Sequence, residues 1–505
     1  MLTLLGLVML PPVAAANVAK VTGEERVSGR VIELTIDTPA FAEPAKVHVN
    51  VPKGYDSDTS RRWPVTYFTA GTMNRYSSFN NFLGGEKLTE NYPSIIVSPD
   101  GRSGYWSDWY NGGEGGPPEY ETYVIDQLIP LIDAHFRTIP DRAHRAIAGI
   151  SMGGYGSLML AARHPDKFVA AASLSGAVDS NLPLLGLALT ASSTFDDAPA
   201  DAIYGPRATQ EVRWRGHNPV DLASNLDDLD LQVRTANGTL NPGIGEDPAS
   251  ADAISCVVEA GVYSGSVSLH QKLESIGVDH LWKDYGAGCH TKPNFRRETL
   301  DTIAGFEKVF RNPPAAPKTF AFRTIEPDFG VYGWRFEADP DRALEFLELD
   351  ASRESITLKG SGATRVTTPA WYRGLKSVDV NGTPAKPGTD GRLQFTADLG
   401  TPHTVQQFTP GASSTFVKKK FTLAPHAVFR FKKVKRTKRG VRVCARVLGG
   451  TVARARIRAG KRVVKVGLGS KPKCRTLKVR RKPARVTIRG RDTFGHTVKA
   501  SKKLR

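Results

Sequence analysis

The sequence predicts an α/β protein with a doubly wound sheet, followed by all-β accessory domains. Through about residue 310, short apolar segments of the strand type alternate with helical segments. That alternation is typical of a sheet covered by helices. After a proline-rich linker at 312–317, the pattern changes to short strands and turns, as in a sandwich or barrel.

The first part of the chain contains eight predicted strands. Residues 31–36 and 46–51 alternate apolar and polar side chains and are joined by a proline-containing turn, so we expect an antiparallel pair. Several of the later segments are short and continuously apolar, as buried parallel strands are. The full set is 31–36, 46–51, 64–69, 94–98, 146–150, 169–173, 231–235 and 280–285, with an amphipathic helix expected over 120–136.

Charge is distributed unevenly along the 505 residues. The whole chain has 69 Lys and Arg against 50 Asp and Glu, yet from Val417 onward about 32 basic residues accompany one acid, Asp492. The preceding part is therefore net acidic. In the basic part, Lys and Arg alternate with Val, Ile and Leu, which favours a folded small β domain over a disordered tail.

The start of the chain resembles a secretion signal. Leu2 to Leu10 is almost wholly apolar, and small residues follow to Ala16, although no basic segment precedes them. We expect a signal peptide at 1–16. This apolar stretch is too short to span a bilayer comfortably. The alternative is a buried N-terminal strand. The signal peptide predicts a secreted or cell-envelope protein.

One segment organises the chemistry of the chain. Gly149-Ile150-Ser151-Met152-Gly153 joins an apolar strand to a helix of small residues. This Gly-x-Ser-x-Gly form is typical of a nucleophile elbow, in which a strained turn exposes the serine hydroxyl. The Met152 N–H then lies at a helix N-terminus, where it can donate to an oxyanion. We expect Ser151 to be a nucleophile; the alternative is a glycine-rich turn without chemistry.

A serine nucleophile on such an elbow needs an acid and then a histidine later in the chain. His290 follows the last predicted strand, in a glycine-containing loop where the base belongs. Three other histidines fit this order and position less well: His217, His270 and His280. The residues alone leave the acid open, because strand 231–235 ends without a carboxylate at the usual place. The candidates are Glu246, Asp247 and Glu259.

A loop rich in aromatic residues follows the strand at 94–98. Because loops at the carboxyl ends of strands bind ligands in α/β sheets, we expect this loop to form a substrate-facing wall. The alternative is a loop covered by its own aromatic rings. The proposed substrate contacts are Trp106, Asp108, Trp109 and Tyr110.

Four motifs together resemble the putative-esterase branch of the α/β-hydrolases, which includes the mycolyltransferases and S-formylglutathione hydrolases. They are the elbow, Ser-Asp-Trp-Tyr at 107–110, Asn237-Gly238 and the glycine-containing segment before the histidine, Ala-Gly-Cys-His at 287–290. The resemblance covers roughly 29–312 and is strongest toward the mycolyltransferases. It implies an α/β-hydrolase sheet, Glu259 as the acid, and the Thr72 backbone N–H as the second oxyanion donor after Met152.

The chain departs from the mycolyltransferases at one motif. They have Leu-Asp-Gly-Leu-Arg, whose aspartate helps to hold trehalose, where this chain has Thr69-Ala70-Gly71-Thr72-Met73. The resemblance therefore does not carry over transfer of mycolate to trehalose. A general esterase or another acyl transfer stays open.

The four cysteines are expected to pair, as they tend to in a secreted protein. Cys444 and Cys474 both lie in the basic β domain and are natural partners. Cys256 is one helical turn before Glu259, and Cys289 immediately precedes His290. If Glu259 contacts His290, the two remaining cysteines come within bonding range. We therefore hypothesise a Cys256–Cys289 bridge; its absence would favour Glu246 as the acid.

The sequence thus predicts a secreted serine carboxylic-ester hydrolase or acyltransferase, with an ester or acyl-lipid substrate and an acyl-enzyme on Ser151. Its domains are a catalytic domain at 29–312, a β-sandwich-like module at 318–423 and a basic β domain at 426–505. The cationic face predicts binding to anionic wall polymer or a membrane surface rather than nucleic acid; a merely solvated face is the alternative. No metal-ligand cluster or nucleotide loop is visible, so no cofactor is expected. The rival function is a non-catalytic envelope-binding protein on a hydrolase scaffold.

Overall fold

The structure, a computed structural model, describes residues 19–111, 116–249, 251–438, 440–450, 452–479 and 483–504. It divides into two compact units, Met1–Pro317 and Lys318–Arg505. The predicted signal peptide at 1–16 lies outside the described residues. Within the described ranges, no helix combines the length and apolarity that a membrane span requires.

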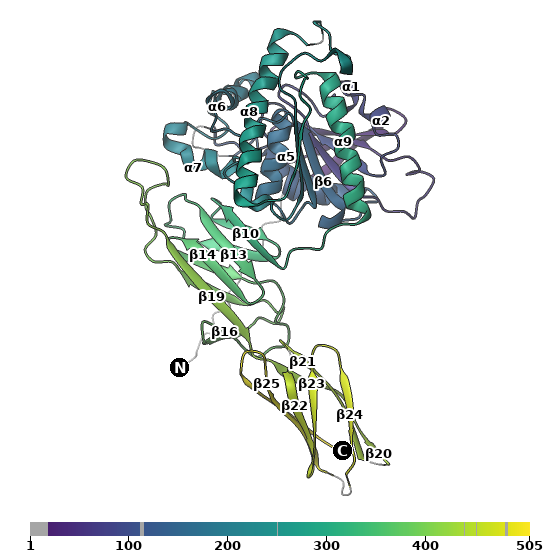
Figure 1. Cartoon of the computed structure of the whole chain (residues 1–505), viewed down its shortest axis with the longest axis vertical. Coiled ribbons are helices and arrows are strands. Elements are labelled where there is room, and N and C mark those ends of the chain that lie inside the picture. The colour runs from purple at the N-terminus through teal and green to yellow at the C-terminus, as the bar shows by residue number, and fades with distance from the viewer. Residues whose placement is uncertain are drawn as a thin grey trace, which may run out of the picture. The chain divides into compact units, whose positions relative to one another are not determined.

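Among the described residues, the first unit is built on one mixed sheet of nine strands, in the order β1-β2-β3-β5-β4-β6-β7-β8-β9. Helices α5 (Met152–Arg163) and α9 (Lys292–Arg311) pack against its strand β6 (Figure 1). Neighbours from β1 through β3 to β5 are antiparallel, and those from β5 to β9 are parallel. The bounds are β1 Lys20–Arg26, β2 Val31–Asp37, β3 Ala45–Asn50, β4 Val65–Thr69, β5 Ile95–Pro99, β6 Arg145–Ile150, β7 Ala170–Leu174, β8 Asp230–Thr235 and β9 Leu281–Asp284.

The eight predicted strands all form, and the edge strand β1 is added to them. Strand β1 was not predicted because its sequence, Lys-Val-Thr-Gly-Glu-Glu-Arg, is largely polar. Its residues are mostly exposed. The central strands β4, β5, β6 and β7 are buried throughout, as their continuous apolar sequences predicted. The prediction of an α/β sheet followed by all-β sheets is confirmed.

Helices connect the strands of this sheet. The helix predicted over 120–136 forms as three consecutive segments, of which the middle one is a π-helix. The bounds are α1 Ser78–Asn81, α2 Gly85–Leu88, α3 Tyr120–Thr122, π-helix η2 Tyr123–Leu128, α4 Ile129–His135, α5 Met152–Arg163, α6 Pro183–Ser192, α7 Arg207–His217, α8 Ala253–Ile276 and α9 Lys292–Arg311. Short 3₁₀ turns are η3 Arg142–His144, η4 Ser193–Asp196, η5 Ala223–Leu226 and η6 Pro242–Ile244.

Two long helices, α8 and α9, flank the loops that form the candidate site. Helix α8 begins where the Asp252 side chain accepts a hydrogen bond from the Ser255 N–H, and it ends at Gly277 in the left-handed conformation. Helix α9 begins where the Thr291 side chain accepts a hydrogen bond from the Asn294 N–H. These caps fix both ends of α8 and the start of α9, so the segment between the two helices has defined ends.

In the part of the second unit that the structure describes, the strands form four all-β sheets. Their strand orders are β10-β13-β14-β19-β16-β17, β11-β12-β15-β18, β20-β21-β24 and β23-β22-β25-β26. The bounds are β10 Thr319–Thr324, β11 Asp328–Val331, β12 Trp334–Ala338, β13 Leu347–Ser352, β14 Ser355–Gly360, β15 Ala363–Thr367, β16 Val378–Val380, β17 Thr383–Ala385, β18 Gln394–Asp398, β19 Val417–Pro425, β20 Val428–Thr437, β21 Gly440–Leu448, β22 Val452–Ala459, β23 Arg462–Leu468, β24 Lys473–Leu477, β25 Arg485–Arg491 and β26 Thr497–Lys503.

Two separate hydrophobic cores lie within this unit, one in the strands before β20 and one in the strands from β20 onward. The boundary drawn from sequence at 423 falls inside β19, which continues to Pro425. In the basic part, Val441, Val443 and Val447 of β21 are buried, whereas Arg442 between them is exposed. Cys444 and Cys474 lie opposite each other on β21 and β24 and form the predicted disulfide.

Candidate active site

Ser151 lies in the turn between β6 and α5, with φ of 56° and ψ of −123°. A positive φ is unfavourable for a residue with a side chain, and such strain is typical of functional turns. The turn is possible only because glycine lies on both sides. A Cβ on Gly149 would be 2.0 Å from Thr69 Oγ1, and one on Gly153 would be 2.0 Å from the Thr69 carbonyl oxygen. Strands β4 and β6 and helix α5 are therefore packed too closely for any larger residue.

Ser151 and His290 line the same cavity, whose volume is about 500 Å³. Thr72 lines it as well, next to Gly71, where a Cβ would lie 3.2 Å from the Ser151 Cβ. The remaining walls are largely apolar. They include Phe82, Tyr105, Leu184, Leu185, Ala188, Val257, Val258, Val262 and Phe295.

His290 is held by a buried carboxylate. Its Nδ1 lies 2.7 Å from Glu259 Oε2, and the Glu259 side chain has no solvent exposure. Because a carboxylate accepts the Nδ1 hydrogen, the neutral imidazole carries its lone pair on Nε2. That Nε2 atom is buried and makes no hydrogen bond to any described residue. The ring is thus oriented and in the correct tautomer to accept a proton inside the cavity.

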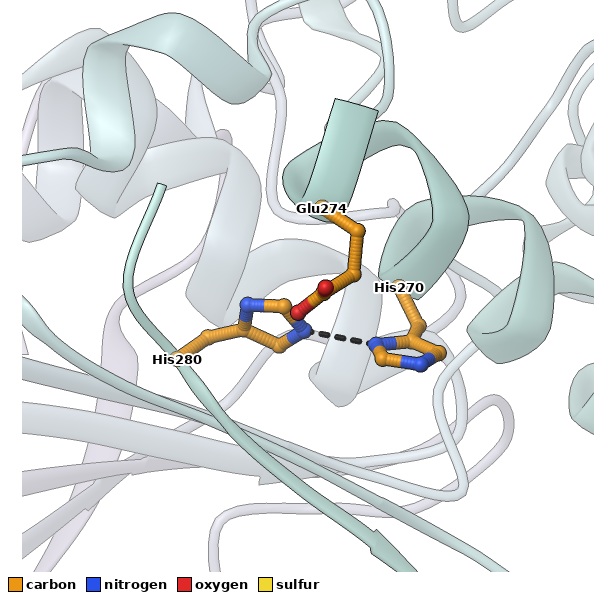
Figure 2. A group of neighbouring side chains, drawn as sticks. All are labelled: His270, Glu274 and His280. Atoms are coloured by element: carbon orange, nitrogen blue, oxygen red, sulfur yellow. Dashed lines mark hydrogen bonds between the residues drawn. The ribbon is translucent and has the colours of Figure 1, made fainter. Parts of the chain in front are cut away.

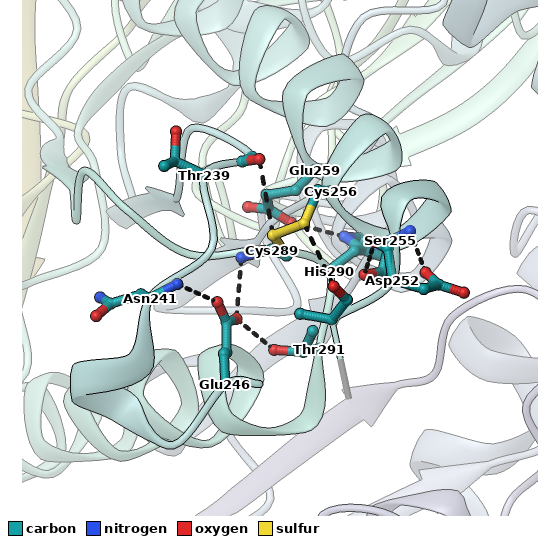
Figure 3. The surroundings of a disulfide bond; sticks show 12 residues. Thr239, Asn241, Glu246, Asp252, Ser255, Cys256, Glu259, Cys289, His290 and Thr291 are labelled. Carbon is teal, nitrogen blue, oxygen red and sulfur yellow. Dashed lines mark hydrogen bonds and ion pairs between the residues drawn. A yellow bond between two sulfur atoms is a disulfide. The ribbon is translucent and has the colours of Figure 1, made fainter. Parts of the chain in front are cut away.

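The Cys256–Cys289 disulfide joins the helix that carries Glu259 to the loop that carries His290 (Figure 3). Its Cα atoms are 4.3 Å apart. The bridge links α8, one turn before Glu259, to the residue that precedes His290. The His290 N–H also donates to the Ser255 carbonyl oxygen at 3.1 Å. The hypothesised bridge is confirmed, and it fixes the histidine loop against the helix that carries the carboxylate.

Glu246, the other candidate acid, supports the same loop from the opposite side (Figure 3). Its Oε1 accepts hydrogen bonds from the Cys289 N–H at 2.9 Å and from the Thr291 hydroxyl at 2.5 Å. Its Oε2 accepts one from the Asn241 N–H at 2.9 Å. Both carboxylate oxygens are therefore used in shaping the backbone around His290. The third candidate, Asp247, accepts a local hydrogen bond from the Ala249 N–H.

A second buried carboxyl group, which the sequence did not reveal, lies behind Glu259. Ser175 Oγ lies 2.5 Å from Glu259 Oε1 and 3.0 Å from Glu298 Oε1. A hydroxyl has one hydrogen, so it cannot donate to both carboxyl groups. Glu259 also accepts a hydrogen bond from the Ala236 N–H at 2.9 Å. The arrangement is satisfied when Ser175 donates to Glu259 and a protonated Glu298 donates to Ser175.

The environment of Glu298 agrees with this assignment. The side chain has no solvent exposure, and its Oε2 has no hydrogen-bond partner among the described residues. Burial, followed by the nearby charge of Glu259, raises the pKa of Glu298 well above its ordinary value. Glu298 lies on the amphipathic helix α9, where a sequence pattern places a glutamate on the solvent side. Only the packing of α9 against Ser175 identifies it.

The four predicted substrate contacts of the aromatic loop are engaged within the protein. Trp106 is fully buried, and its Nε1–H donates to the Ala70 carbonyl oxygen at 3.3 Å. Its indole fills the space left by two glycines, because a Cβ on Gly101 or Gly156 would come within 2.3 Å of the ring. Trp109 is also buried and donates to the Gly104 carbonyl oxygen at 3.1 Å.

The other two predicted contacts are likewise engaged within the protein. Asp108 accepts hydrogen bonds from the Thr122 N–H at 3.1 Å and hydroxyl at 2.6 Å, and burial raises its pKa to about 6. The Tyr110 ring lies 4.7 Å from the Arg213 guanidinium. None of the four lines the cavity of Ser151, and Tyr105 is the aromatic of this loop that does. This packing favours the alternative of a loop covered by its own rings over a substrate-facing wall.

The comparisons with known proteins agree with this architecture. A family model described as Putative esterase matches residues 38–304, more than half of the chain. The chain belongs to the Putative esterase family. The predicted resemblance to the esterase and mycolyltransferase branch is thereby confirmed. Esterase Rv1288 of Mycobacterium tuberculosis is 32% identical over 261 residues, which is 51% of this chain and 55% of the relative.

Two further proteins illustrate the range of these relatives. Diacylglycerol acyltransferase/mycolyltransferase Ag85B of Mycobacterium leprae is 29% identical over 226 residues, or 41% of this chain and 66% of the relative. The crystal structure of Mycobacterium tuberculosis MPT51 has 20% identity and a TM-score of 0.46, covering 56% of this chain and 100% of that chain. This chain spans about half the length of the first curated relatives that it matches. The family model and the curated relatives support an esterase or acyltransferase.

Proposed function

We propose that this protein is a serine carboxylic-ester hydrolase or acyltransferase that works through an acyl-enzyme on Ser151. The observation that carries the proposal is the buried Glu259–His290 pair, whose unpartnered Nε2 shares a cavity with a serine on a strained elbow. Nucleophile, base and orienting acid are the three roles that acyl transfer requires.

In the proposed mechanism, His290 Nε2 accepts the proton of the Ser151 hydroxyl as Oγ attacks the ester carbonyl. Glu259 holds the imidazole by Nδ1 and stabilises the imidazolium that forms. The proton then passes to the leaving alcohol, and an acyl-enzyme remains. Water or a second alcohol, activated by the same histidine, releases the acyl group. Hydrolysis and transfer differ only in this acceptor.

The oxyanion of each tetrahedral intermediate is assigned to two backbone N–H groups. Met152 is the first residue of α5, so its N–H has no partner within the helix. Thr72 lies on the other side of Ser151, where Gly71 permits the close approach of the two chains. Each donor of this kind contributes about 3 kcal/mol to the transition state.

The walls of the cavity favour an apolar acyl group. Leu184 and Val257 line the cavity yet are 56% and 64% exposed, so apolar surface continues from its interior to its opening. A volume of about 500 Å³ is within the usual range for small-molecule sites. We propose esters of medium-length acyl chains as substrates. Transfer to trehalose is not proposed, since Ala70 stands in the segment where the mycolyltransferases carry an aspartate.

We further propose that the protein is secreted and that its basic β domain binds anionic wall polymer or membrane surface. The two disulfides support an oxidising compartment, and the exposed Lys and Arg of β20 to β26 support anion binding. A chain ending at Pro425 should lose binding to anionic cell-wall preparations at low salt. Equal binding by the shortened chain would refute this part of the proposal.

The catalytic proposal is tested with p-nitrophenyl esters of increasing acyl length. The wild-type chain should hydrolyse fastest the esters whose medium-length acyl chains fit the cavity. Ser151→Ala should abolish turnover. Ser60→Ala, a change at an exposed serine outside the cavity lining, is the matched control and should behave as wild type. Absence of turnover in the folded wild-type protein, with retained envelope binding, would favour the non-catalytic alternative.

A further inference from the structure

Three metal-ligand side chains converge on the surface of the first unit, outside the lining of the catalytic cavity. His270 and Glu274 lie four residues apart on α8 and so share one face of the helix. Gly277 ends the helix in the left-handed conformation and turns the chain back. His280, just before β9, then faces His270, with His270 Nδ1 2.8 Å from His280 Nε2 (Figure 2).

Both imidazole rings also make contacts outside the cluster. His280 Nδ1 lies 2.9 Å from the Val278 carbonyl oxygen, which can only accept, so this nitrogen carries the hydrogen. The lone pair of His280 is therefore on Nε2, the atom that faces His270. The His270 ring stacks on Trp282 with centroids 4.6 Å apart and planes within 3°. A backbone carbonyl that holds the distal nitrogen of a histidine is the usual support of a metal-binding imidazole.

The distances fit a small divalent cation. One ligand atom from each of His270, Glu274 and His280 lies within 4.8 Å of the others. Two nitrogens bound tetrahedrally to Zn²⁺ at about 2.0–2.1 Å are about 3.3 Å apart. The two imidazoles, which here share a hydrogen, need to separate by only about 0.5 Å to admit the ion. Both side chains are partly exposed, so rotation about their side-chain bonds allows this adjustment.

We propose that His270, Glu274 and His280 form a Zn²⁺-binding site on the catalytic unit. His270 Nδ1, one Glu274 carboxylate oxygen and His280 Nε2 are the protein ligands, and water completes a tetrahedron. The hydrogen that His270 Nδ1 shares with His280 moves to His270 Nε2 when the ion binds, which frees the Nδ1 lone pair. Two imidazoles and one carboxylate favour zinc and its borderline neighbours over Ca²⁺ or Mg²⁺, which prefer sets of oxygen ligands. The sequence shows no compact metal-ligand motif here, because the third ligand comes from beyond the helix that carries the other two.

The position of the site gives it a structural role. It joins the last turns of α8 to the beginning of β9, and these same two elements lead to Glu259 and His290. His270 is eleven residues beyond Glu259, or about 16 Å along the helix. The ion is therefore too far along α8 to take part in acyl transfer. Its effect is to secure the segment between acid and base at the end opposite the Cys256–Cys289 bridge.

Isothermal titration of the chelator-treated full chain with ZnCl₂ tests the proposal. His280→Ala should weaken Zn²⁺ binding at this site by more than about 100-fold, since even supporting residues around a metal contribute 10- to 100-fold. Glu274→Gln, at an exposed position, should weaken it by at least about tenfold. Co²⁺ should give the intense visible bands of tetrahedral coordination in wild type, and His280→Ala should lose them.

A matched control is needed because Asp379, His426 and His496 in the second unit also bring three metal-ligand side chains together. His426→Ala should leave the Zn²⁺ affinity and the Co²⁺ spectrum of the proposed site unchanged. The proposal is overturned if His280→Ala and Glu274→Gln both bind Zn²⁺ as wild type does. It is also overturned if wild type binds no Zn²⁺, or if His426→Ala removes all of the Zn²⁺ binding that wild type shows. Circular dichroism establishes that each variant is folded, and Glu274→Gln decides the outcome if His280→Ala is not.

Discussion

Two adjacent buried glutamates offer a sharp test of the assigned protonation states. Glu259 and Glu298 both contact Ser175 Oγ, and both have no solvent exposure. The same change, glutamate to glutamine, can be made at either position. Because the account assigns a charge to Glu259 and a proton to Glu298, the two variants should behave very differently.

Glu259→Gln should nearly abolish activity. The carboxylate accepts three hydrogen bonds, from Ser175, Ala236 and His290. An amide has only one accepting oxygen, so its NH₂ group must face a donor at one of its two ends. If it faces His290, the imidazole is driven to the tautomer with its hydrogen on Nε2, which cannot accept the Ser151 proton. Such a change in a triad acid lowers kcat about 10⁴-fold, or about 5 kcal/mol in the barrier.

Glu298→Gln should retain kcat within about threefold of wild type, a change of less than about 1 kcal/mol in the barrier. A protonated carboxyl and an amide have nearly the same shape, and the amide N–H can donate to Ser175 Oγ in place of the O–H. Steady-state hydrolysis of a soluble p-nitrophenyl ester at neutral pH measures both variants. Equal losses in the two, or a large loss only in Glu298→Gln, would refute the assignment.

Three further outcomes follow from the same contacts. The wild type should lose stability relative to Glu298→Gln as pH rises above about 4.5, because the raised pKa of Glu298 keeps a proton on the folded state that the unfolded chain releases. The loss is up to about 1.4 kcal/mol per pH unit until the pKa of Glu298 in the folded state is reached. Urea unfolding at several pH values measures this difference in stability. Replacing Cys256 and Cys289 by serine should cost about 3–4 kcal/mol of stability for a separation of 33 residues and should lower kcat, whereas replacing Cys444 and Cys474 should leave kcat unchanged. Trp106→Ala should cost about 3–5 kcal/mol in urea unfolding with KM nearly unchanged; a large rise in KM at unchanged stability would return Trp106 to the substrate wall.

Much of the site could be predicted because its parts have local signals. The elbow is contiguous in sequence, and its glycines are required by the close contact of β6 and α5 with Thr69. The cysteine hypothesis succeeded for a different reason. A helical turn separates Cys256 from Glu259, and Cys289 adjoins His290, so a single contact between acid and base brings both pairs together.

The parts of the site that could not be predicted from sequence depend on which way side chains face. The aromatic composition of residues 104–110 indicates burial or ligand contact equally well, and only the packing of Trp106 against Gly101 and Gly156 decides for burial. Glu298 has no local signal, because its partner Ser175 is more than a hundred residues away in sequence. The zinc ligands are hidden in the same way, since His280 joins His270 and Glu274 only through the turn at Gly277.

The most direct test of the central claim is to identify the residue that becomes covalently modified. The full chain is treated with a fluorophosphonate probe, digested and mapped by mass spectrometry. We predict one adduct, on Ser151, that forms at wild-type rate in Ser60→Ala and fails to form in folded Ser151→Ala. Labelling of another serine, or undiminished labelling of Ser151→Ala, would contradict Ser151 as the nucleophile.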